Sequence, residues 1–230
     1  MTIELKNNCS EFDSYRAARV KSMFNAETGA NWQKTVNLDL PEDWGLGLII
    51  GKSGSGKTSL GKKIFKTDKI YSPYDNWEKN KPIIDCINSE GSFDEVTSAL
   101  SGVGLGDVPS WLRPFHALSN GQQFRAGLAR VLCEAPNEVV IDEFTSVVDR
   151  QIAKIGALAF GKAWGRKKGK KAVLLSCHYD IIEWLQPDWV YNIDTNELKK
   201  KAKLSPDQNS SLTFGRSTKV TGKSLKSIII

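Results

Sequence analysis

The chain has 230 residues, of which 40% are hydrophobic and 25% charged, and its formal net charge is +6. These values are typical of one globular domain or two small ones. No stretch approaches the roughly eighteen apolar residues of a membrane span, and residues 1–8 lack the apolar core of a signal peptide. We therefore expect a cytoplasmic protein that does not insert into a membrane. The four cysteines form no CxxC pair, which predicts reduced thiols rather than a metal or disulfide framework.

The first third of the chain predicts two short strands, a buried strand and a helix. Residues 19–25 and 35–40 have the composition of strands, with turn-forming residues between them. Residues 46–50 form a short apolar run that is typical of a buried central strand. Leu60 and Ile64 then recur four residues apart, as on one face of a helix.

Strands and helices alternate through the rest of the chain. Ser92 can cap a helix that runs to residue 100, and the glycine- and proline-rich stretch 102–114 predicts a loop. We expect strands at residues 82–87, 139–141, 172–175 and 189–193, and helices at residues 122–134, 152–159 and 180–185. This alternation predicts a parallel, doubly wound α/β sheet.

A glycine-rich loop, Gly51-Lys-Ser-Gly-Ser-Gly-Lys-Thr58, matches the pattern GxxxxGK[ST] between an apolar strand and a helix. Its glycines let backbone N–H groups turn towards phosphates, and the helix N-terminus adds partial positive charge. Lys57 can neutralise the β- and γ-phosphates, and the Thr58 hydroxyl can bind Mg²⁺. We therefore predict the phosphate-binding loop of a P-loop NTPase, formed by Gly51, Ser53, Gly54, Ser55, Gly56, Lys57, Thr58 and Ser59.

Further motifs follow in the second half of the chain. Leu118-Ser-Asn-Gly-Gln122 precedes an amphipathic helix, where a hydroxyl at the helix N-terminus suits a phosphate, although it can equally be a plain helix cap. Asp142 and Glu143 end a strand; they can hold Mg²⁺ through water and polarise an attacking water, or they can be solvated acids of a turn. His178 also follows a strand and can contact a γ-phosphate, although a lone histidine is more often structural.

In this order the motifs resemble the nucleotide-binding domain of ABC ATPases over residues 18–196. Residues 118–122 are similar to the LSGGQ signature, with Asn120 in place of its first glycine, and Ser146-Val-Val-Asp149 is similar to the D-loop. The resemblance implies an ABC-type P-loop fold with a parallel-sheet core, an N-terminal antiparallel β part and a small helical subdomain. It implies an ATPase domain at residues 1–198, with the helical subdomain at about 88–120. Residues 199–230 are then a basic tail or the start of a C-terminal extension.

The resemblance also implies that the protein hydrolyses ATP with Mg²⁺ as a head-to-tail homodimer. On the copy that binds the phosphates, catalysis would fall to Lys57, Glu143 and His178, and Mg²⁺ would be held by Thr58 and Asp142. The other copy would contribute Ser119 and Gly121 to the γ-phosphate, with Gln122 among the nucleotide-binding residues, and Asp149 would lie at the interface and link the two sites.

Two family features have no clear match in this sequence. An aromatic residue usually stacks on adenine at the end of the first strand; Phe24 is the first choice for it and Trp32 the second, and either could instead be a core residue. No glutamine lies between Gln33 and Gln122, so the usual Q-loop glutamine is missing. Its place should follow the strand predicted at residues 82–87, where Asp85 and Asn88 are the nearest polar candidates.

A narrower resemblance rests on the segments 19–25, 108–115, 142–150 and 176–185. They are similar to soluble bacterial and phage ABC-type ATPases, some of which are fused at the C-terminus to a predicted GNAT acetyltransferase domain. Residues 215–230 would be the start of such an extension. No acetyl-CoA-binding motif is visible in this chain, so we predict no acetyltransferase activity.

The sequence leaves several functions open. The short helical subdomain and the basic runs at residues 166–171 and 198–203 favour a soluble ATP-driven switch that acts on nucleic acid or on a protein partner. The alternative is the ATP-binding subunit of an ABC transporter with a separate membrane subunit. Two further hypotheses fit the sequence less well. A binding module that clamps ATP without turnover would not need the water-activating carboxylate of Glu143, and a P-loop nucleotide kinase would not need the signature or His178.

Overall fold

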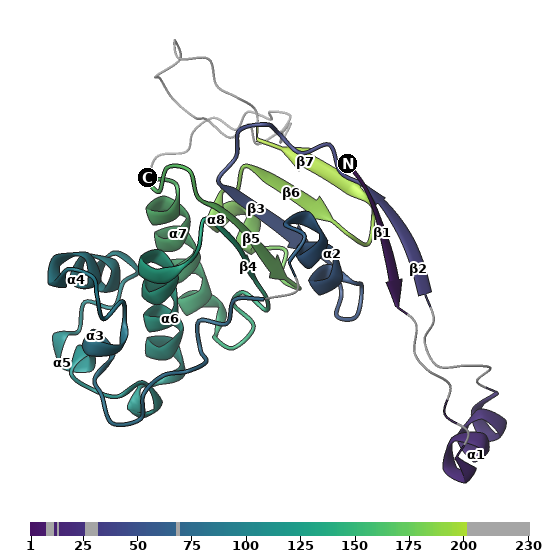
Figure 1. Ribbon diagram of the computed structural model, residues 1–230, viewed down its shortest axis with the longest axis horizontal. Coiled ribbons are helices and arrows are strands. Elements are labelled where there is room, and N and C mark those ends of the chain that lie inside the picture. The colour runs from purple at the N-terminus through teal and green to yellow at the C-terminus, as the bar shows by residue number, and fades with distance from the viewer. Residues whose placement is uncertain (8–11, 13, 26–31, 68–69, 202–230) are drawn as a thin grey trace, which may run out of the picture.

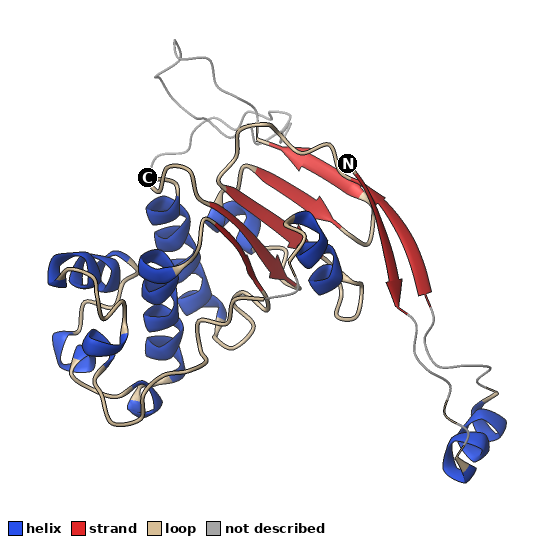
Figure 2. Cartoon of the chain, in the orientation of Figure 1, coloured by secondary structure: helices blue, strands red, loops and turns tan. Residues whose placement is uncertain are grey.

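A computed structural model describes residues 1–7, 12, 14–25, 32–67 and 70–201 (Figures 1 and 2). Its centre is a five-stranded sheet with the strand order β4-β5-β3-β6-β7. Four strands are parallel and the last is antiparallel to its neighbour. In sheet order their bounds are Glu138–Ile141, Lys171–Ser176, Leu46–Ile50, Trp189–Asn192 and Glu197–Lys200. The predicted α/β fold with a parallel core sheet is confirmed.

The central strand β3 is buried along its whole length, as its apolar sequence predicts. Leu48 lies opposite Leu174 on one side and Val190 on the other. Because alternate side chains point to opposite faces, Leu48 joins one hydrophobic core and Ile49 joins a second.

Each face of the sheet therefore has its own covering layer. One face packs against α6 (Asn120–Glu134), α7 (Arg150–Trp164) and α8 (Ile181–Leu185). The other face packs against α2 (Lys57–Ile64) and an antiparallel pair formed by β1 (Thr2–Asn7) and β2 (Trp32–Asn37). Figure 1 shows α6 and α7 on one side of the sheet and α2 with the β1–β2 pair on the other.

The helical region, residues 83–117, lies beside α6 and away from the sheet (Figures 1 and 2). It contains α3 (Ile83–Cys86), α4 (Phe93–Gly102), α5 (Val108–Trp111) and a 3₁₀ turn, η1 (Phe115–Ala117). As predicted, Ser92 caps α4: its hydroxyl accepts a 3.2 Å hydrogen bond from the Glu95 amide. The region overlaps the helical subdomain predicted at about 88–120, and the reduced size of that subdomain stays a prediction.

Two predicted strands are wrong. Residues 19–25 belong to the helix α1 (Tyr15–Phe24), which Ser14 caps and which ends at Asn25 in the left-handed conformation, φ 49°. Residues 82–87 contain the helical turn α3, because Ile83 and Ile87, four residues apart, are both buried on one side of it. Apolar runs this short do not distinguish a helix from a strand by periodicity alone.

Other elements were not anticipated from the sequence. The stretch 102–114 contains the helical turn α5, and the strand β1 lies at the N-terminus. The basic run at 198–203 overlaps β7, which pairs with β6 up to Lys200, where the ATPase domain was expected to end at residue 198. Within the described ranges, no helix is both long enough and apolar enough to cross a bilayer.

We expect Gly47→Ala to lower the free energy of unfolding by about 1–3 kcal/mol, the usual cost of overpacking. A Cβ at Gly47 would lie 2.0 Å from Cζ2 of Trp189, whose ring is fully buried. Gly102→Ala is the matched control, because nothing lies within 4 Å of the Cβ that it would add. Urea denaturation of both variants checks this, and equal losses would contradict the close packing of Trp189 over β3.

Candidate functional site

Four parallel strands end at one edge of the sheet, and the predicted motifs follow three of these ends. The glycine-rich loop follows β3, the paired carboxylates follow β4, and the segment 176–178 closes β5. This edge is where open α/β sheets bind ligands. A cavity of about 300 Å³ lies there, lined by Trp32, Ser53, Gly54, Gly56, Lys57, Thr58, Ser59, Asp142, Glu143, Ser146, Leu175, Ser176 and Cys177.

The glycine-rich loop wraps around the end of the Lys57 side chain. The ammonium of Lys57 donates hydrogen bonds to the carbonyls of Gly51 at 2.8 Å and Lys52 at 2.7 Å. Gly54 and Gly56 have φ angles of 75° and 93°, in the left-handed region that glycine adopts at low cost. The loop leads directly into α2, so backbone N–H groups, partial helix charge and an ammonium meet at one place, as an anion site requires.

Thr58 and Asp142 bring the loop and the end of β4 into contact. The Thr58 hydroxyl donates a 2.6 Å hydrogen bond to Asp142 Oδ2, and the Glu143 amide donates one of 2.8 Å to Asp142 Oδ1. Both carboxylate oxygens are thus held in fixed directions. The arrangement places a hydroxyl and a carboxylate, both hard oxygen ligands, side by side at the cavity.

Glu143 lies in a strained turn at the end of β4. Its φ is 51° and that of Thr145 is 71°, values that cost a side-chain-bearing residue on the order of 1–3 kcal/mol each. The Ser146 hydroxyl braces the turn with a 2.8 Å hydrogen bond to the Glu143 carbonyl. Strain of this kind collects at functional sites, and here it accompanies a carboxylate that lines the cavity.

The end of β5 contributes backbone and small side chains rather than a histidine to the cavity wall. Ser176 and Cys177 line the cavity, while the half-buried His178 is not among its lining residues; its amide donates a 3.1 Å hydrogen bond to the Ser176 hydroxyl. The predicted contact between His178 and a γ-phosphate therefore stays a prediction.

The sequence reasoning missed a link between the phosphate loop and the neighbouring strand ends. Asp194 follows β6, and its Oδ2 accepts hydrogen bonds from the Lys52 amide at 2.9 Å and from the Tyr179 hydroxyl at 3.1 Å. The available signal was positional, because parallel strands end at one edge, so an acid after β6 must lie near the loop after β3.

Residues 70–74 run along the carboxylate side of the site. The Tyr71 amide donates a 2.9 Å hydrogen bond to the Val140 carbonyl, and a second cavity of about 300 Å³ is lined by residues 70–74 together with Asp142, Glu143 and Val147. Ser72 is thus the small polar side chain at this wall.

The two tyrosines of this segment are held neutral. Burial, reinforced by nearby Glu134, raises the pKa of Tyr71 to about 12, and burial also raises the pKa of Tyr74. Neither phenol can therefore act as a base beside Glu143 at neutral pH.

Neither candidate for the missing glutamine lines these two cavities. Asp85 lies in α3. Asn88 donates a hydrogen bond from its backbone N–H to Glu134 at 2.8 Å and one from its side-chain Nδ2 to Glu95 at 3.3 Å. The structure places residues 70–74 at this edge instead, because the strand expected at 82–87 is absent.

The aromatic residue beside the phosphate loop is Trp32, the second choice from the sequence. Its ring packs against Gly56, where a Cβ would lie 2.6 Å from Trp32 Cη2, and it lines the loop cavity. Phe24 is in α1, is exposed, and is not a lining residue of that cavity. The expectation that Phe24 ends a strand is wrong because that segment is helical.

The signature-like residues lie apart from this cavity. Ser119 caps α6 in a reciprocal box with Gln122, and Gln122 Nε2 donates a 2.7 Å hydrogen bond to the Ser110 hydroxyl. Gly121 is buried so closely against Ile152 that a Cβ would lie 2.6 Å from its Cδ1. Ser119, Gly121, Gln122 and Asp149 are all absent from the lining of the phosphate-loop cavity.

Asp149 has a structural task that can be seen directly. Its Oδ1 accepts hydrogen bonds from the amides of Gln151 at 2.9 Å and Ile152 at 3.0 Å, so it caps α7. Its neighbour Arg150 pairs with Asp180 and lies 5.2 Å from the ring centre of Trp184. The segment 146–149 is thus held at its C-terminal end, by the cap on α7 and by the contacts of Arg150 with α8.

The fold has close counterparts among solved structures. The ATP-binding cassette MJ0796, in a dimeric post-hydrolysis state bound to ADP and Pi, superposes with a TM-score of 0.55 over 73% of this chain and 89% of that chain, at 17% identity. A second dimeric structure of the same bacterial ABC transporter cassette gives a TM-score of 0.53 at 18% identity. This chain has the fold of an ABC-type ATP-binding cassette.

Sequence comparison also finds relatives of this chain. It is 26% identical over 207 residues to the methionine import ATP-binding protein MetN 1 of Acinetobacter baylyi, covering 74% of this chain. It is 28% identical over 200 residues to the dipeptide transport ATP-binding protein DppF of Lactococcus lactis, covering 65% of this chain. The chain spans 57% and 58% of the lengths of these two relatives. The sequence matches no protein-family model.

These comparisons do not show the narrower resemblance to cassettes fused to a GNAT domain. The segment on which that extension was predicted, residues 215–230, lies outside the described residues.

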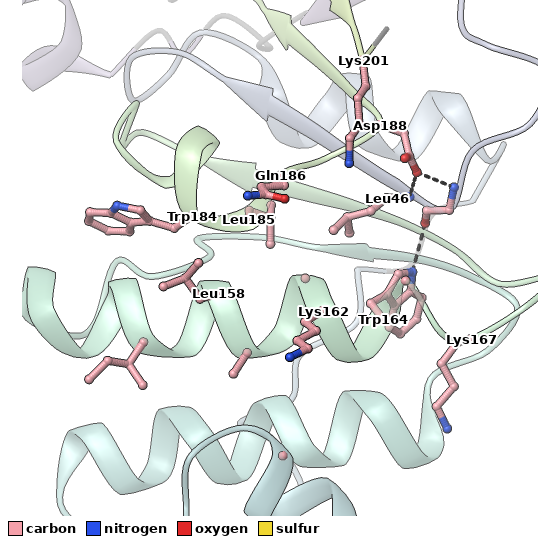
Figure 3. Close-up of a pocket in the computed structure, with 16 residues that line it drawn as sticks. Leu46, Leu158, Lys162, Trp164, Lys167, Trp184, Leu185, Gln186, Asp188 and Lys201 are labelled. Atoms are coloured by element: carbon pink, nitrogen blue, oxygen red, sulfur yellow. Dashed lines mark hydrogen bonds between the residues drawn. The ribbon is translucent and has the colours of Figure 1, made fainter. Parts of the chain in front are cut away.

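A larger cavity lies elsewhere in the described part of the chain (Figure 3). It measures about 750 Å³ and borders Gly45 and Leu46, at the start of β3 and therefore at the sheet edge opposite the phosphate loop. Trp164 and Trp184 form apolar walls of this cavity. Asp188 Oδ2 accepts hydrogen bonds from the amides of Gly45 at 2.8 Å and Leu46 at 2.9 Å. Cavity size alone would therefore favour the edge of the sheet opposite the predicted motifs.

We expect Trp32→Ala to weaken MgADP binding about 5- to 100-fold, since stacking of a base on an aromatic ring contributes roughly 1–3 kcal/mol. Phe24→Ala is the matched control and should leave MgADP affinity unchanged, because Phe24 does not line the cavity. Isothermal titration calorimetry measures both. Loss of affinity in the Phe24 variant alone would restore the first choice made from the sequence.

Proposed function

We propose that this cassette binds ATP with Mg²⁺ and hydrolyses it in a head-to-tail dimer of two copies. The observation that carries the proposal is the convergence of Lys57, Thr58, Asp142 and Glu143 on one cavity at the carboxyl edge of the sheet. The fold and the order of the motifs agree with it.

The residues at the site fit Mg²⁺. Thr58 Oγ1 and Asp142 Oδ2 are 2.6 Å apart, so one ion could be held by the hydroxyl directly and by the carboxylate through water. Mg²⁺ prefers such a site, with few protein oxygens and the remaining positions filled by water and phosphate oxygens. Bound there, the ion would neutralise charge on the β- and γ-phosphates.

The chain's own residues supply positioning and charge. The Lys57 ammonium, held by two loop carbonyls, can turn to phosphate oxygens that enter the loop. Glu143 can accept a hydrogen bond from a water and orient it towards the γ-phosphorus. As the water oxygen bonds to phosphorus, the bond to the β–γ bridging oxygen breaks; its electron pair leaves with ADP, and the proton of the water passes to Glu143 or to the phosphate.

The dimer is proposed because, within one copy, the signature does not line the phosphate-loop cavity. Ser119 and Gly121 are not part of the phosphate-loop cavity, although the capped N-terminus of a 15-residue helix is suited to an anion. A two-fold arrangement would place the signature of each copy against the nucleotide of the other. The structural neighbour MJ0796 is itself dimeric. ATP would then join the copies, and loss of its γ-phosphate would release them.

We further propose that ATP turnover serves a separate membrane subunit. The relatives are an import and a transport ATP-binding protein, which favours the transporter hypothesis over the nucleic-acid or protein switch predicted first. The structure weakens one argument for the switch, because part of the basic run at 198–203 belongs to the edge strand β7. A cytoplasmic location suits either hypothesis.

Glu143→Gln should keep ATP binding, lower turnover about 10²- to 10⁴-fold as loss of a positioned base does, and accumulate an ATP-bound dimer. Lys57→Ala should remove nucleotide binding. Glu138→Gln, the same change at the exposed start of β4, is the control and should turn over ATP normally. Phosphate release and light scattering after size exclusion measure these outcomes. A Glu143→Gln protein that stays monomeric in saturating ATP and Mg²⁺ would disprove the dimer.

The coupling can be tested by measuring ATP hydrolysis with and without DNA and RNA at low and moderate salt, together with affinity purification from detergent-solubilised membranes. If the chain is a transporter subunit, nucleic acid should not change its rate of ATP hydrolysis, and a membrane protein should co-purify with it. Stimulation by nucleic acid that weakens with salt, as backbone contacts do, would reverse the choice in favour of the switch.

A further inference from the structure

The helix α1 is a feature that the proposed ATPase cycle does not use. It is inserted between β1 and β2, and none of its residues is buried. Figure 1 shows it standing away from both layers of the fold. A ten-residue helix without a packed face has little reason to be stable by itself, so it needs a partner surface.

One side of α1 combines apolar and basic side chains. At 3.6 residues per turn, about half of its circumference carries six residues: Tyr15, Arg16, Arg19, Val20, Met23 and Phe24. Tyr15, Met23 and Phe24 are 79%, 67% and 73% exposed. The helix contains no Asp or Glu. Its partner should therefore be acidic and also present apolar groups.

The strand that comes after α1 in the sequence begins next to the phosphate loop. This strand, β2, begins at Trp32, whose ring lies against Gly56 of that loop. In the proposed dimer the same loop faces the signature of the other copy. Because Gln122 of that signature contacts Ser110 on α5, the helical region of the other copy would lie beside the same interface.

The helical region has the properties that α1 requires. Between residues 83 and 117 the sequence has five acidic residues and one arginine, Arg113, in a chain whose net charge is +6. On α5 and directly after it, Val108 and Leu112 are 52% and 70% exposed. The Ser110 hydroxyl on α5 accepts the hydrogen bond from Gln122, so this apolar surface adjoins the signature.

We propose that α1 is an inter-subunit arm, which docks its apolar and basic side on the acidic helical region of a second copy next to that copy's signature. This inference rests on the proposed ATP-bound dimer and adds a contact outside the nucleotide. Two-fold symmetry gives two such contacts per dimer. Nucleic acid could also attract Arg16 and Arg19, but it would leave the exposed Val108 and Leu112 without an occupant.

The first test maps the contact. A photo-crosslinking benzoylphenylalanine replaces Phe24 in the Glu143→Gln protein, and copies labelled with nitrogen-15 are mixed with unlabelled copies. The arm predicts crosslinks that require ATP, join a labelled to an unlabelled copy, and map by mass spectrometry to residues 83–117. Crosslinks within one copy, crosslinks to another region, or crosslinks that need only nucleic acid would each overturn it.

The second test measures affinity. In the Glu143→Gln protein, Arg16→Glu with Arg19→Glu should raise the dimer dissociation constant about 10-fold or more, because like charges then face each other. Arg166→Glu with Lys168→Glu makes the same charge change on the exposed turn after α7 and should raise it less than about 3-fold. Equal effects of the two double variants would overturn the arm while leaving the dimer intact. A Glu143→Gln protein that never dimerises would instead disprove the dimer itself.

Discussion

The hydrogen bond between Thr58 and Asp142 is the constraint on which the site depends. It joins the first turn of α2 to the end of β4, and β5 lies between β3 and β4 in the sheet. Such a bond can form only where parallel strands end together, so the loop after β3 and the acid after β4 share one edge. The bond also fixes the direction of the Asp142 side chain. In the turn that follows Asp142, the backbone of Glu143 and Thr145 is in the left-handed region. The strained backbone of the turn and the fixed direction of the Asp142 carboxylate thus occur together in the same few residues.

The packing of α2 explains why the loop before it holds its shape. Gly61 allows the helix to lie close on the sheet, because a Cβ there would be 2.8 Å from Val140 and 3.2 Å from Leu175. Leu60 beside it is fully buried in the core on that face. A helix held this closely cannot rotate, so its N-terminus stays directed at the cavity. The position of the phosphate site is therefore set by apolar packing on the sheet rather than by polar contacts within the loop alone.

The elements that the sequence predicted well are those whose signal is local. Residues 46–50 form a continuous apolar run before a glycine-rich loop, and they are β3; Ser92 precedes two acids, and it caps α4. The pairing of Trp32 with Gly56, or of Asp194 with Lys52, could not be predicted in this way, because each depends on which strands are neighbours. The strand predictions for residues 19–25 and 82–87 were wrong for a different reason. Segments this short fit the period of a helix and that of a strand equally well. The cap by Ser14 and the burial of Ile83 and Ile87 show that they are helical, but both depend on the folded surroundings.

The contact between Gln122 and Ser110 would give the helical region a physical role in the proposed ATP cycle. Gln122 belongs to the capping box of α6 and also binds α5, so the orientation of the signature depends on where α5 lies. Ser110 is fully buried, and its hydroxyl also donates to Asp107, which leaves little freedom for the two to move separately. Anything that docks on Val108 and Leu112 would therefore shift the signature with them. By linkage, a signature held against the γ-phosphate would also favour that docking. Binding of a partner and binding of ATP across the dimer would then be coupled through one side-chain amide, without any movement of the sheet that holds the phosphate loop.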